Sequence, residues 1–217
     1  MAEGPDRQEL LTALTTEHFT LQGARSQTIG ESGTRASLYV FSVSSTLVAL
    51  GFIAQVSEVG DAFDVFALTV LPTLYVLGLF TFVRLVETSV EDILYGRAIN
   101  RIRSYYLQRA GDEARWFVLG GHDDPFGVIA NMGIRPTRMQ LYFTSAMMIA
   151  VINSVIGGSA VAIAIGAIFD APLGVAVAIG GVGAIASLVA LTRLDRRMHE
   201  VGAVGFEPMF PSPEQAP

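Results

Sequence analysis

The sequence predicts an all-α integral membrane protein with four transmembrane helices in two hairpins and long cytoplasmic amphipathic helices. Two observations predict this class. The chain is 51% hydrophobic and only 16% charged, whereas a soluble domain usually carries about a quarter charged residues. The deficit lies in residues 36–83 and 139–192, which contain no arginine. Each stretch is long enough for two helices of about 20 residues, the length that crosses a bilayer. Soluble domains that bury such runs are the alternative, but core helices rarely extend so far without charge.

We expect these apolar stretches to divide the chain into five segments. They are a cytoplasmic N-terminal helix (1–35), a first transmembrane hairpin (36–83), a cytoplasmic helix and loop (84–138), a second transmembrane hairpin (139–192) and a mobile cytoplasmic tail (193–217). The spans are expected at about residues 36–56, 63–83, 140–169 and 173–191. Since backbone groups in lipid must be satisfied within the segment, the spans are predicted as helices.

The distribution of arginine predicts the orientation. All 14 basic residues are arginines, and all lie before the first span, between the second and third, or after the fourth. The predicted outer loops instead carry acids: Glu58, Asp61 and Asp64 in one and Asp170 in the other. The positive-inside rule places both termini and the middle segment in the cytoplasm. No cleavable signal peptide is expected, because the first apolar run begins only near Ala36.

Residues 84–110 are predicted to extend the second span as one long helix into the cytoplasm. Their apolar residues recur at helical spacing, opposite a face that includes Asn100 and Arg101. The N-terminal segment offers a partner helix, since Asp6 and Glu9 make a capping-box-like start and leucines follow on one face. We expect the two helices to pack together. A helix that lies on anionic lipid is the alternative.

Pro72 interrupts the second span and is predicted to kink it near Leu68–Thr69. The hydroxyl of Thr69 or Thr73 is expected to satisfy the carbonyl that loses its partner. The kink serves either packing or, as the alternative, a gating hinge.

Small residues recur along one face of the third span and in the same register in the fourth. Such faces let helix backbones approach closely in lipid. The third and fourth spans are expected to pack on each other through them, or, alternatively, to share them between subunits of an oligomer. The first two spans carry bulky side chains suited to lipid, namely Phe41, Phe52, Phe66, Phe80 and Phe82. The helix-packing residues are Ala146, Ala150, Ser154, Gly158, Ala162, Gly166, Ala176, Gly180 and Ala184.

Few polar side chains lie inside the predicted spans. Asn153 is the one strongly polar side chain and is interpreted as a hydrogen-bonding link between helices, or else as a selectivity or substrate contact. The hydroxyl cluster 42–46, with Ser45 and Thr46, either bonds its own helix or lines a narrow polar path. Because no ionisable residue lies deep in a span, a proton-coupled pump is disfavoured.

The sequence offers little for catalysis. It has no phosphate loop, nucleophile elbow or zinc-protease motif, so no enzyme activity and no cofactor are expected. It has no cysteine, and His122, Asp123 and Asp124 are adjacent, which makes a poor metal site. We expect a solvated turn there. Phe206, Met209 and Phe210 in the proline-rich tail are expected to fray rather than to dock on a neighbour.

The segment "ARSQTIGESGTRASLYVFSVSSTLVALGFIAQ" and its continuation, about residues 8–110, resemble bacterial two-span membrane effector modules of the SLATT and Pycsar types. The similarity is one of architecture: cytoplasmic helix, span, short outer turn, span, long cytoplasmic helix. The chain also resembles uncharacterised actinobacterial four-span membrane proteins. The resemblance implies a bacterial cytoplasmic (inner) membrane location and a protein that oligomerises and disrupts the membrane when an upstream sensor fires.

These observations leave three functional hypotheses. The first is an oligomeric membrane effector or channel-like protein without enzymatic activity, with membrane lipid and further copies of itself as partners. The second is a non-catalytic scaffold or accessory subunit that binds a partner protein through residues 84–110. The third is a small-solute transporter. No nucleic-acid partner is expected.

Overall fold

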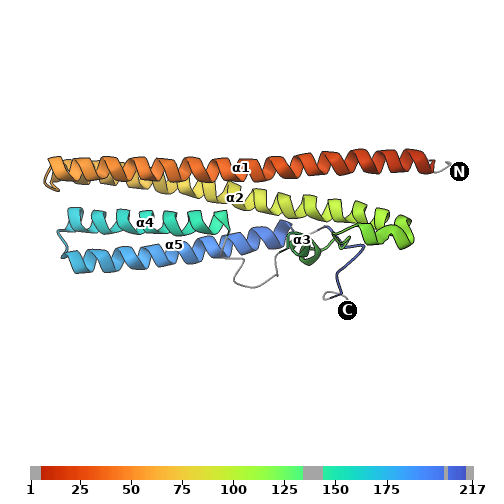
Figure 1. Cartoon of the computed structure of the whole chain (residues 1–217). Helices are drawn as coiled ribbons and strands as arrows, with labels where there is room; N and C mark the ends of the chain where they lie inside the picture. Colours follow the sequence, from red (N-terminus) through yellow and green to blue (C-terminus); the bar gives the residue numbers. More distant parts are fainter. Residues whose placement is uncertain (1–5, 134–143, 203–204, 214–217) are drawn as a thin grey trace. The chain divides into compact units, whose positions relative to one another are not determined.

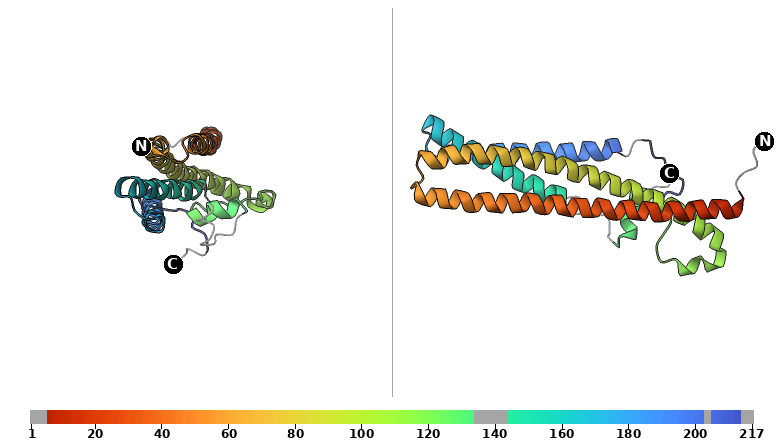
Figure 2. Two further views of the ribbon diagram at one scale, coloured as in Figure 1. Left: turned by 90° about the vertical axis from the view of Figure 1, so that its left-hand side faces the viewer. Right: turned by 90° about the horizontal axis from the view of Figure 1, so that it is seen from above.

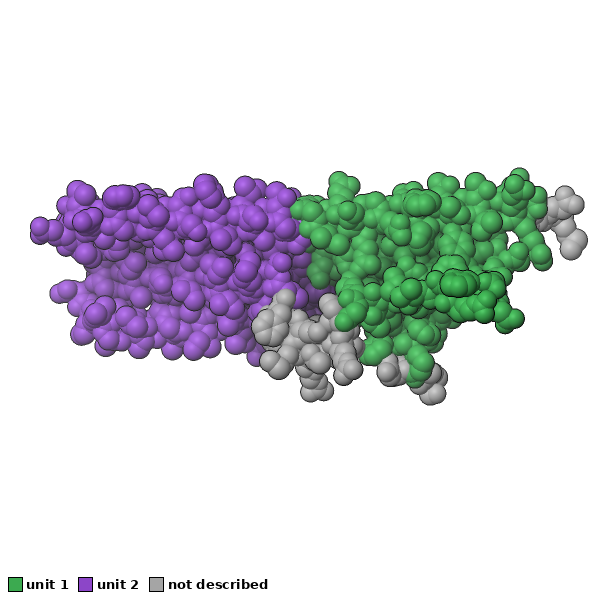
Figure 3. Space-filling model, viewed as in Figure 1, with its two compact units in different colours: residues 1–31, 88–140, 203–217 green, residues 32–87, 141–202 purple. Residues whose placement is uncertain are grey.

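A computed structural model describes residues 6–133, 144–202 and 205–213 of the chain. All regular secondary structure in this described part is helical, which confirms the predicted all-α class (Figure 1). The chain divides into two compact units, and Figure 3 colours them separately. Unit 1 comprises residues 1–31, 88–140 and 203–217, and unit 2 comprises residues 32–87 and 141–202. The elements are α1 (Arg7–Val56), α2 (Asp61–Ala110), the 3₁₀ helix η1 (Gly111–Trp116), α3 (Pro125–Asn131), α4 (Ser145–Phe169) and α5 (Leu173–Gly202).

Helices α1 and α2 are each 50 residues long, about 75 Å at 1.5 Å per residue. The predicted continuity of the second span with the amphipathic segment is therefore confirmed. The N-terminal segment likewise continues into the first span without a break. Both helices contribute one part to unit 1 and the other part to unit 2.

Four helices are long and apolar enough to cross a membrane: α1, α2 with η1, α4 and α5. This confirms the prediction of four apolar helices of spanning length. The boundaries differ in places. Helix α4 begins at Ser145, capped by the Thr144 hydroxyl, which accepts a hydrogen bond from the Met147 amide. Residues 140–143 of the expected third span lie outside the described part, and α5 continues past the expected end at Leu191 to Gly202.

The core of unit 2 is formed by buried side chains from α1, α2, α4 and α5. Tyr39, Phe82, Val86 and Ile149 are at most 1% exposed. By contrast, Phe41, Phe52 and Phe80 point outward and are 65–72% exposed. Because such large apolar side chains face outward, unit 2 is compatible with a lipid environment. Phe82 does not face outward as expected of it, since its place in the helical period of α2 turns it into the core.

In unit 1, residues 7–31 of α1 pack on residues 88–110 of α2, as expected. The guanidinium of Arg25 donates to both carboxylate oxygens of Asp92, at 2.8 and 3.1 Å. Further along, the Thr15 and Tyr106 hydroxyls lie 3.3 Å apart, and the rings of His18 and Tyr106 meet edge to face. These contacts favour helix packing over the alternative of a helix lying alone on lipid.

Helices α4 and α5 pack against each other closely, and Figure 2 shows them from two further sides. A Cβ atom on Gly158 would lie 2.5 Å from the Gly180 carbonyl oxygen and 2.7 Å from the Ala184 methyl group. Gly180 faces Gly158 and Ala162 in the same way. Glycine is required at both positions, because any side chain would force the two backbones apart.

Candidate functional site

The polar side of α2 in unit 1 binds the main chain of residues 120–124. Arg97 and Asn100 are only 4% and 3% exposed. The Asn100 amide donates to the His122 carbonyl at 2.8 Å, and the Arg97 Nε donates to the Asp123 carbonyl at 3.1 Å. Ser104 donates to the Gly121 carbonyl, and the absence of a side chain on Gly121 permits this approach. The polar face that carries Asn100 is therefore partly buried beneath a loop.

Asp123 and Asp124 follow in this loop and are both 0% exposed. The Asp123 carboxylate accepts hydrogen bonds from Arg101 Nε at 2.6 Å and from the Phe210 and Met209 amides at 2.7 and 3.1 Å. Asp124 caps α3 by accepting from the Gly127 amide at 2.6 Å, and it also accepts from the Ser212 amide. The expectation of a solvated turn is therefore wrong. These carboxylates hold N–H groups that lie far along the chain, a pairing that no local pattern signals.

Ionisation of this acidic pair is favoured by its hydrogen bonds. Burial raises the pKa of Asp123, but the Phe210 amide, the Arg101 guanidinium and the Met209 amide together lower the pKa below its ordinary value of 3.8. Burial likewise opposes the ionised form of Asp124, and the Ser212 and Gly127 amides outweigh it, so that its pKa is also lowered. Both side chains are therefore carboxylates at neutral pH. Their oxygens are occupied by N–H donors, which leaves them poor ligands for a cation.

Residues 206–212 form a non-helical segment on this surface, which bends at Met209 and Phe210 and which we call the C-terminal strap. The Phe206 ring lies under two guanidinium groups, 3.9 Å from the Arg97 Cζ and 4.2 Å from the Arg101 Cζ. The same arginines donate to the carbonyls of Phe206 and Glu207 at 2.7 and 2.6 Å. The Phe210 carbonyl accepts from the Asp123 amide at 3.1 Å. The segment is thus docked on unit 1, and the expectation that it frays is wrong. The expected mobile tail (193–217) is also wrong at its start, because residues 193–202 are helical as the end of α5. Residues 203–204 and 214–217 of it lie outside the described part.

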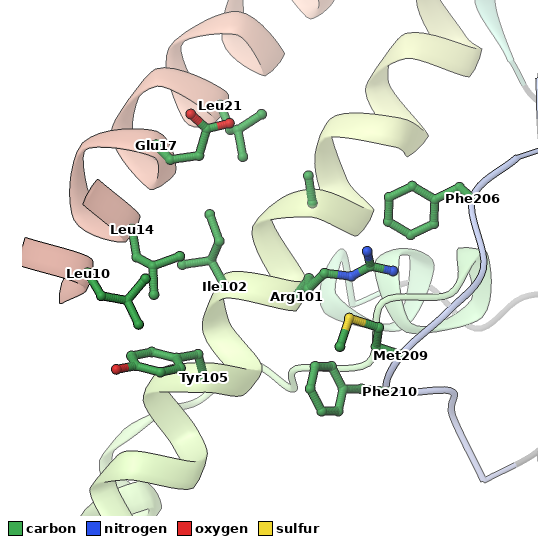
Figure 4. A pocket seen from close by; sticks show the side chains of 11 residues that line it. Leu10, Leu14, Glu17, Leu21, Arg101, Ile102, Tyr105, Phe206, Met209 and Phe210 are labelled. Atoms are coloured by element: carbon green, nitrogen blue, oxygen red, sulfur yellow. The ribbon is translucent and has the colours of Figure 1, made fainter. Parts of the chain in front are cut away.

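An apolar groove lies beside the strap in unit 1 (Figure 4). Its volume is about 450 Å³, within the usual range for ligand pockets. Leucines of α1 form one wall, α2 forms the floor and the strap forms the other wall. The charged residues in the lining are Glu17 and Arg101, and Arg101 is already paired with Asp123. The lining residues are Leu10, Leu14, Glu17, Leu21, Ala98, Arg101, Ile102, Tyr105, Phe206, Met209 and Phe210.

The loop that follows α2 carries a run of exposed apolar side chains. Trp116 is 72% exposed and Val118 is 95% exposed. The Trp116 indole donates to the Glu113 carboxylate at 2.5 Å, so its polar atom is satisfied within η1. Phe117 and Leu119 are 43% and 41% exposed. The sequence distinguishes neither this run nor the groove from ordinary core residues, because both are apolar.

In unit 2, Asn153 links three helices. It is fully buried, and its Oδ1 accepts a hydrogen bond from the Tyr39 hydroxyl at 2.9 Å. Gly78 of α2 lies against both side chains and leaves room for them. Of the other proposed polar contacts, Ser45 is exposed and Thr46 is half-buried, and the structure brings neither to Asn153. This arrangement favours the helix-linking interpretation of Asn153.

A second polar link joins α2 to α4 and α5. The hydroxyls of Tyr75 and Ser187 lie 2.9 Å apart, and Ser154 donates to Ser187 at 3.2 Å. The Tyr75 ring lies against Gly157, where a Cβ atom would approach the ring to 2.6 Å. Hydroxyls elsewhere bond their own helix, as Ser42 does to the Leu38 carbonyl at 2.9 Å. Tyr39 of α1 and Tyr75 of α2 are thus held by partners on α4 and α5.

The predicted stripe of small residues has two environments. Gly158 and Ala162 of α4 meet Gly180 and Ala184 of α5, where the helix backbones approach each other. By contrast, Gly166 has open space around its Cβ position. The remaining members of the stripe, Ala146, Ala150, Ser154 and Ala176, are at most 4% exposed.

Pro72 lies within α2, which continues as a helix on both sides of it. Thr69 donates to the Val65 carbonyl and Thr73 to the Thr69 carbonyl, each at 2.8 Å. Neither hydroxyl bonds the carbonyl of Leu68, which is the one that lacks an amide partner because of Pro72. The expectation that one of these threonines satisfies it is therefore wrong, because a threonine in a helix reaches the carbonyl four residues earlier. The kink stays a prediction.

No family model, curated protein or solved structure matches this chain. The functional proposal therefore rests on the contacts of this chain alone.

Proposed function

We propose that this chain is a non-catalytic membrane scaffold or accessory subunit that binds a partner protein through unit 1. In this proposal the four apolar helices cross a bacterial cytoplasmic membrane as two hairpins, with both termini and residues 84–138 inside. The confinement of arginine to the non-spanning segments supports this orientation. The observation that carries the proposal is the open apolar groove in the unit that carries most of the charge.

The partner that the groove fits is an amphipathic helix with aliphatic side chains. Leu10, Leu14 and Leu21 of α1 offer one apolar wall, and Ile102 and Tyr105 of α2 offer the surface beside it. Such grooves between helices bind the apolar face of a further helix through residues spaced three and four apart. Glu17 is exposed at the rim of this surface. We therefore expect a basic residue beside the apolar stripe of the partner.

The test is co-purification of the partner with groove variants. Leu14→Asp places a carboxylate in the groove, and its desolvation opposes docking. Leu11→Asp is the matched control, because Leu11 is 47% exposed and does not line the groove. After cross-linking in native membranes, one protein is expected in a fixed ratio with wild type and Leu11→Asp, and at least tenfold less with Leu14→Asp. Equal recovery from all three forms would contradict the proposal.

An oligomeric, channel-like effector is the second candidate. The observation in its favour lies on α5, where Gly174 and Gly181 are exposed and nothing lies within 4 Å of their Cβ positions. An outward glycine surface lets a helix of a second copy approach closely in lipid. Ion flux from liposomes that hold the purified chain, with Gly181→Leu as the comparison, tests this candidate. Flux that Gly181→Leu reduces supports the effector, and a silent monomer argues against it.

A further inference from the structure

The contacts of the strap involve its main chain more than its side chains. The amides of Met209 and Phe210 donate to Asp123, and the amide of Ser212 donates to Asp124. In the other direction, carbonyls of the strap accept hydrogen bonds from Arg97, Arg101 and the Asp123 amide. The carboxylates accept hydrogen bonds from amides, and the guanidinium groups donate hydrogen bonds to carbonyls. Both kinds of hydrogen bond are charge-assisted. This is how a protein surface binds a peptide ligand.

The two prolines of the strap fit this mode of binding. The strap reads Phe-Glu-Pro-Met-Phe-Pro-Ser from residue 206 to residue 212. Proline has no amide N–H, and both prolines fall at positions where the carboxylates require none. From Pro208 to Ser212, every amide N–H that exists is therefore taken by Asp123 or Asp124. The prolines also restrict the φ angles of the free segment, which reduces the entropy lost on docking.

One side chain of the strap adds an anchor. The Phe206 ring lies within 4.2 Å of the Cζ atoms of both arginines, well inside the roughly 6 Å over which a cation–π contact acts. Glu207, in contrast, is exposed, and only its carbonyl is bound. The surface therefore selects an aromatic residue followed, at fixed distance, by a proline-flanked pair of amides.

We infer that residues 206–212 are a separable peptide ligand, and that Arg97, Arg101, Asp123 and Asp124 form a socket for any segment of this pattern. The pattern is an aromatic residue, any residue, proline, two apolar residues, proline and a small residue. The cis strap occupies the socket in the resting chain. A peptide with this pattern on another polypeptide competes with it. This inference does not need the apolar groove to have a partner.

The test uses the full-length chain in detergent and a fluorescent peptide of residues 205–213. A weakened-strap variant, Phe206→Ala with Phe210→Pro, removes the aromatic anchor and one bound amide but keeps every socket residue. We expect the peptide to bind this variant at least tenfold more tightly than wild type, in which the tethered strap competes at high effective concentration. Equal binding to both forms, or binding to neither, overturns the inference.

Controls on the peptide leave the protein unchanged. Methylation of the Phe210 amide nitrogen removes the N–H that Asp123 Oδ1 accepts, and this peptide is expected to bind the variant at least tenfold more weakly. Replacement of Glu207 by alanine is the matched control and is expected to leave the affinity unchanged. If the methylated peptide binds as well as the parent, the socket does not recognise the main chain and the inference fails.

Amide hydrogen exchange in the wild-type chain gives a second readout that does not depend on any variant folding. The amides of Met209, Phe210 and Ser212 are expected to exchange at least tenfold more slowly than in the free peptide. Exchange at the rate of the free peptide would mean that the socket is empty. Because Phe206, Met209 and Phe210 also line the groove, release of the strap would open that side of it. Any effect of this opening on a partner protein rests on the proposed function.

Discussion

At the residue scale, several buried polar groups of unit 1 are satisfied by main-chain groups from distant parts of the sequence. Asp123 and Asp124 are the clearest cases, since each accepts amide N–H groups of residues more than 80 positions later in the sequence. A buried carboxylate without such donors costs several kcal/mol in proteins, roughly, and would be protonated instead. The strap and the acidic pair therefore depend on each other.

This dependence predicts a defined effect of pH on Asp123→Asn. The folded pKa of Asp123 lies below the ordinary 3.8, so its stabilising effect is fully present above pH 3.8 and is lost as the pH falls through the lowered value. We expect Asp123→Asn to lower stability by about 1.5–3 kcal/mol between pH 5 and pH 7, the range for a charge-assisted hydrogen bond. Thermal unfolding at each pH measures it. The difference from wild type should shrink only below pH 3.8.

Asp112→Asn is the control for this experiment, because Asp112 is exposed in η1. It should unfold like wild type throughout. If the difference in stability between wild type and Asp123→Asn disappeared near pH 6, the lowered pKa of Asp123 would be contradicted.

Gly158 offers a second prediction at the residue scale. Gly158→Leu must displace the α5 backbone, since its Cβ alone would lie 2.5 Å from the Gly180 carbonyl oxygen. We expect a loss of about 1–3 kcal/mol or more, the range for overpacking. Unfolding in mixed detergent measures the loss. Gly166→Leu is the matched control from the same stripe and should be nearly neutral, because its Cβ position is open; an equal loss from both would contradict the packing.

At the element scale, α2 continues from unit 2 into unit 1 because its apolar residues keep the helical spacing throughout. Only the segments that they contact change. Before Glu87 its side chains are those of an apolar span. After Thr88 the same helical spacing places apolar residues toward α1 and polar ones toward the loop 120–124. The glycine that ends α2 is Gly111, which has φ 53° and follows the last residue of the helix. The helix therefore continues without a break from unit 2 into unit 1.

The α1–α2 contact in unit 1 predicts a measurable coupling between Arg25 and Asp92. The side chains of this bidentate pair are 24% and 17% exposed. A double-mutant cycle of Arg25→Gln and Asp92→Asn is expected to give about 1 kcal/mol, the upper part of the range for surface pairs. The exposed pair Arg84 and Glu87, at 3.1 Å on one helix, is the comparison and should give only about 0.3 kcal/mol. Equal couplings would show that the Arg25 contact does not join the two helices.

At the scale of the whole molecule, the proposed topology assigns each arginine-bearing segment to one side of the membrane. The chain contains no cysteine, so each introduced cysteine is a unique probe. Glu58→Cys and Ala171→Cys place the probe at the two predicted outer turns. Asp112→Cys and Gln8→Cys place it in unit 1.

In the proposed topology, a membrane-impermeant maleimide labels the two outer probes in intact cells. The two inner probes react only after the membrane is opened, because the reagent cannot cross the hydrocarbon core. Labelling of Asp112→Cys in intact cells would contradict the orientation, whatever the fate of the outer probes.

The sequence alone determines the four long helices of this protein, though not where α4 begins or α5 ends. Helical class, four apolar helices of spanning length and the continuity of α2 follow from hydrophobic runs and periodicity, which are local properties. The small residues that let α4 and α5 approach were also recognisable, and so was Asn153 as a polar group in an apolar span. Their partners were not, since Tyr39 and Asn153 are 114 positions apart.

Only the tertiary structure decides the candidate site. An acidic dipeptide before a proline and a proline-rich tail each look like solvated chain when read locally. They become a socket and its ligand because folding brings Asp123 within 2.7 Å of the Phe210 amide nitrogen, and each then satisfies groups that the other leaves unpaired. The same holds for the groove, whose leucines look like core until the structure leaves them uncovered. Pairing between distant segments carries no local signal, whereas the length and period of a helix do.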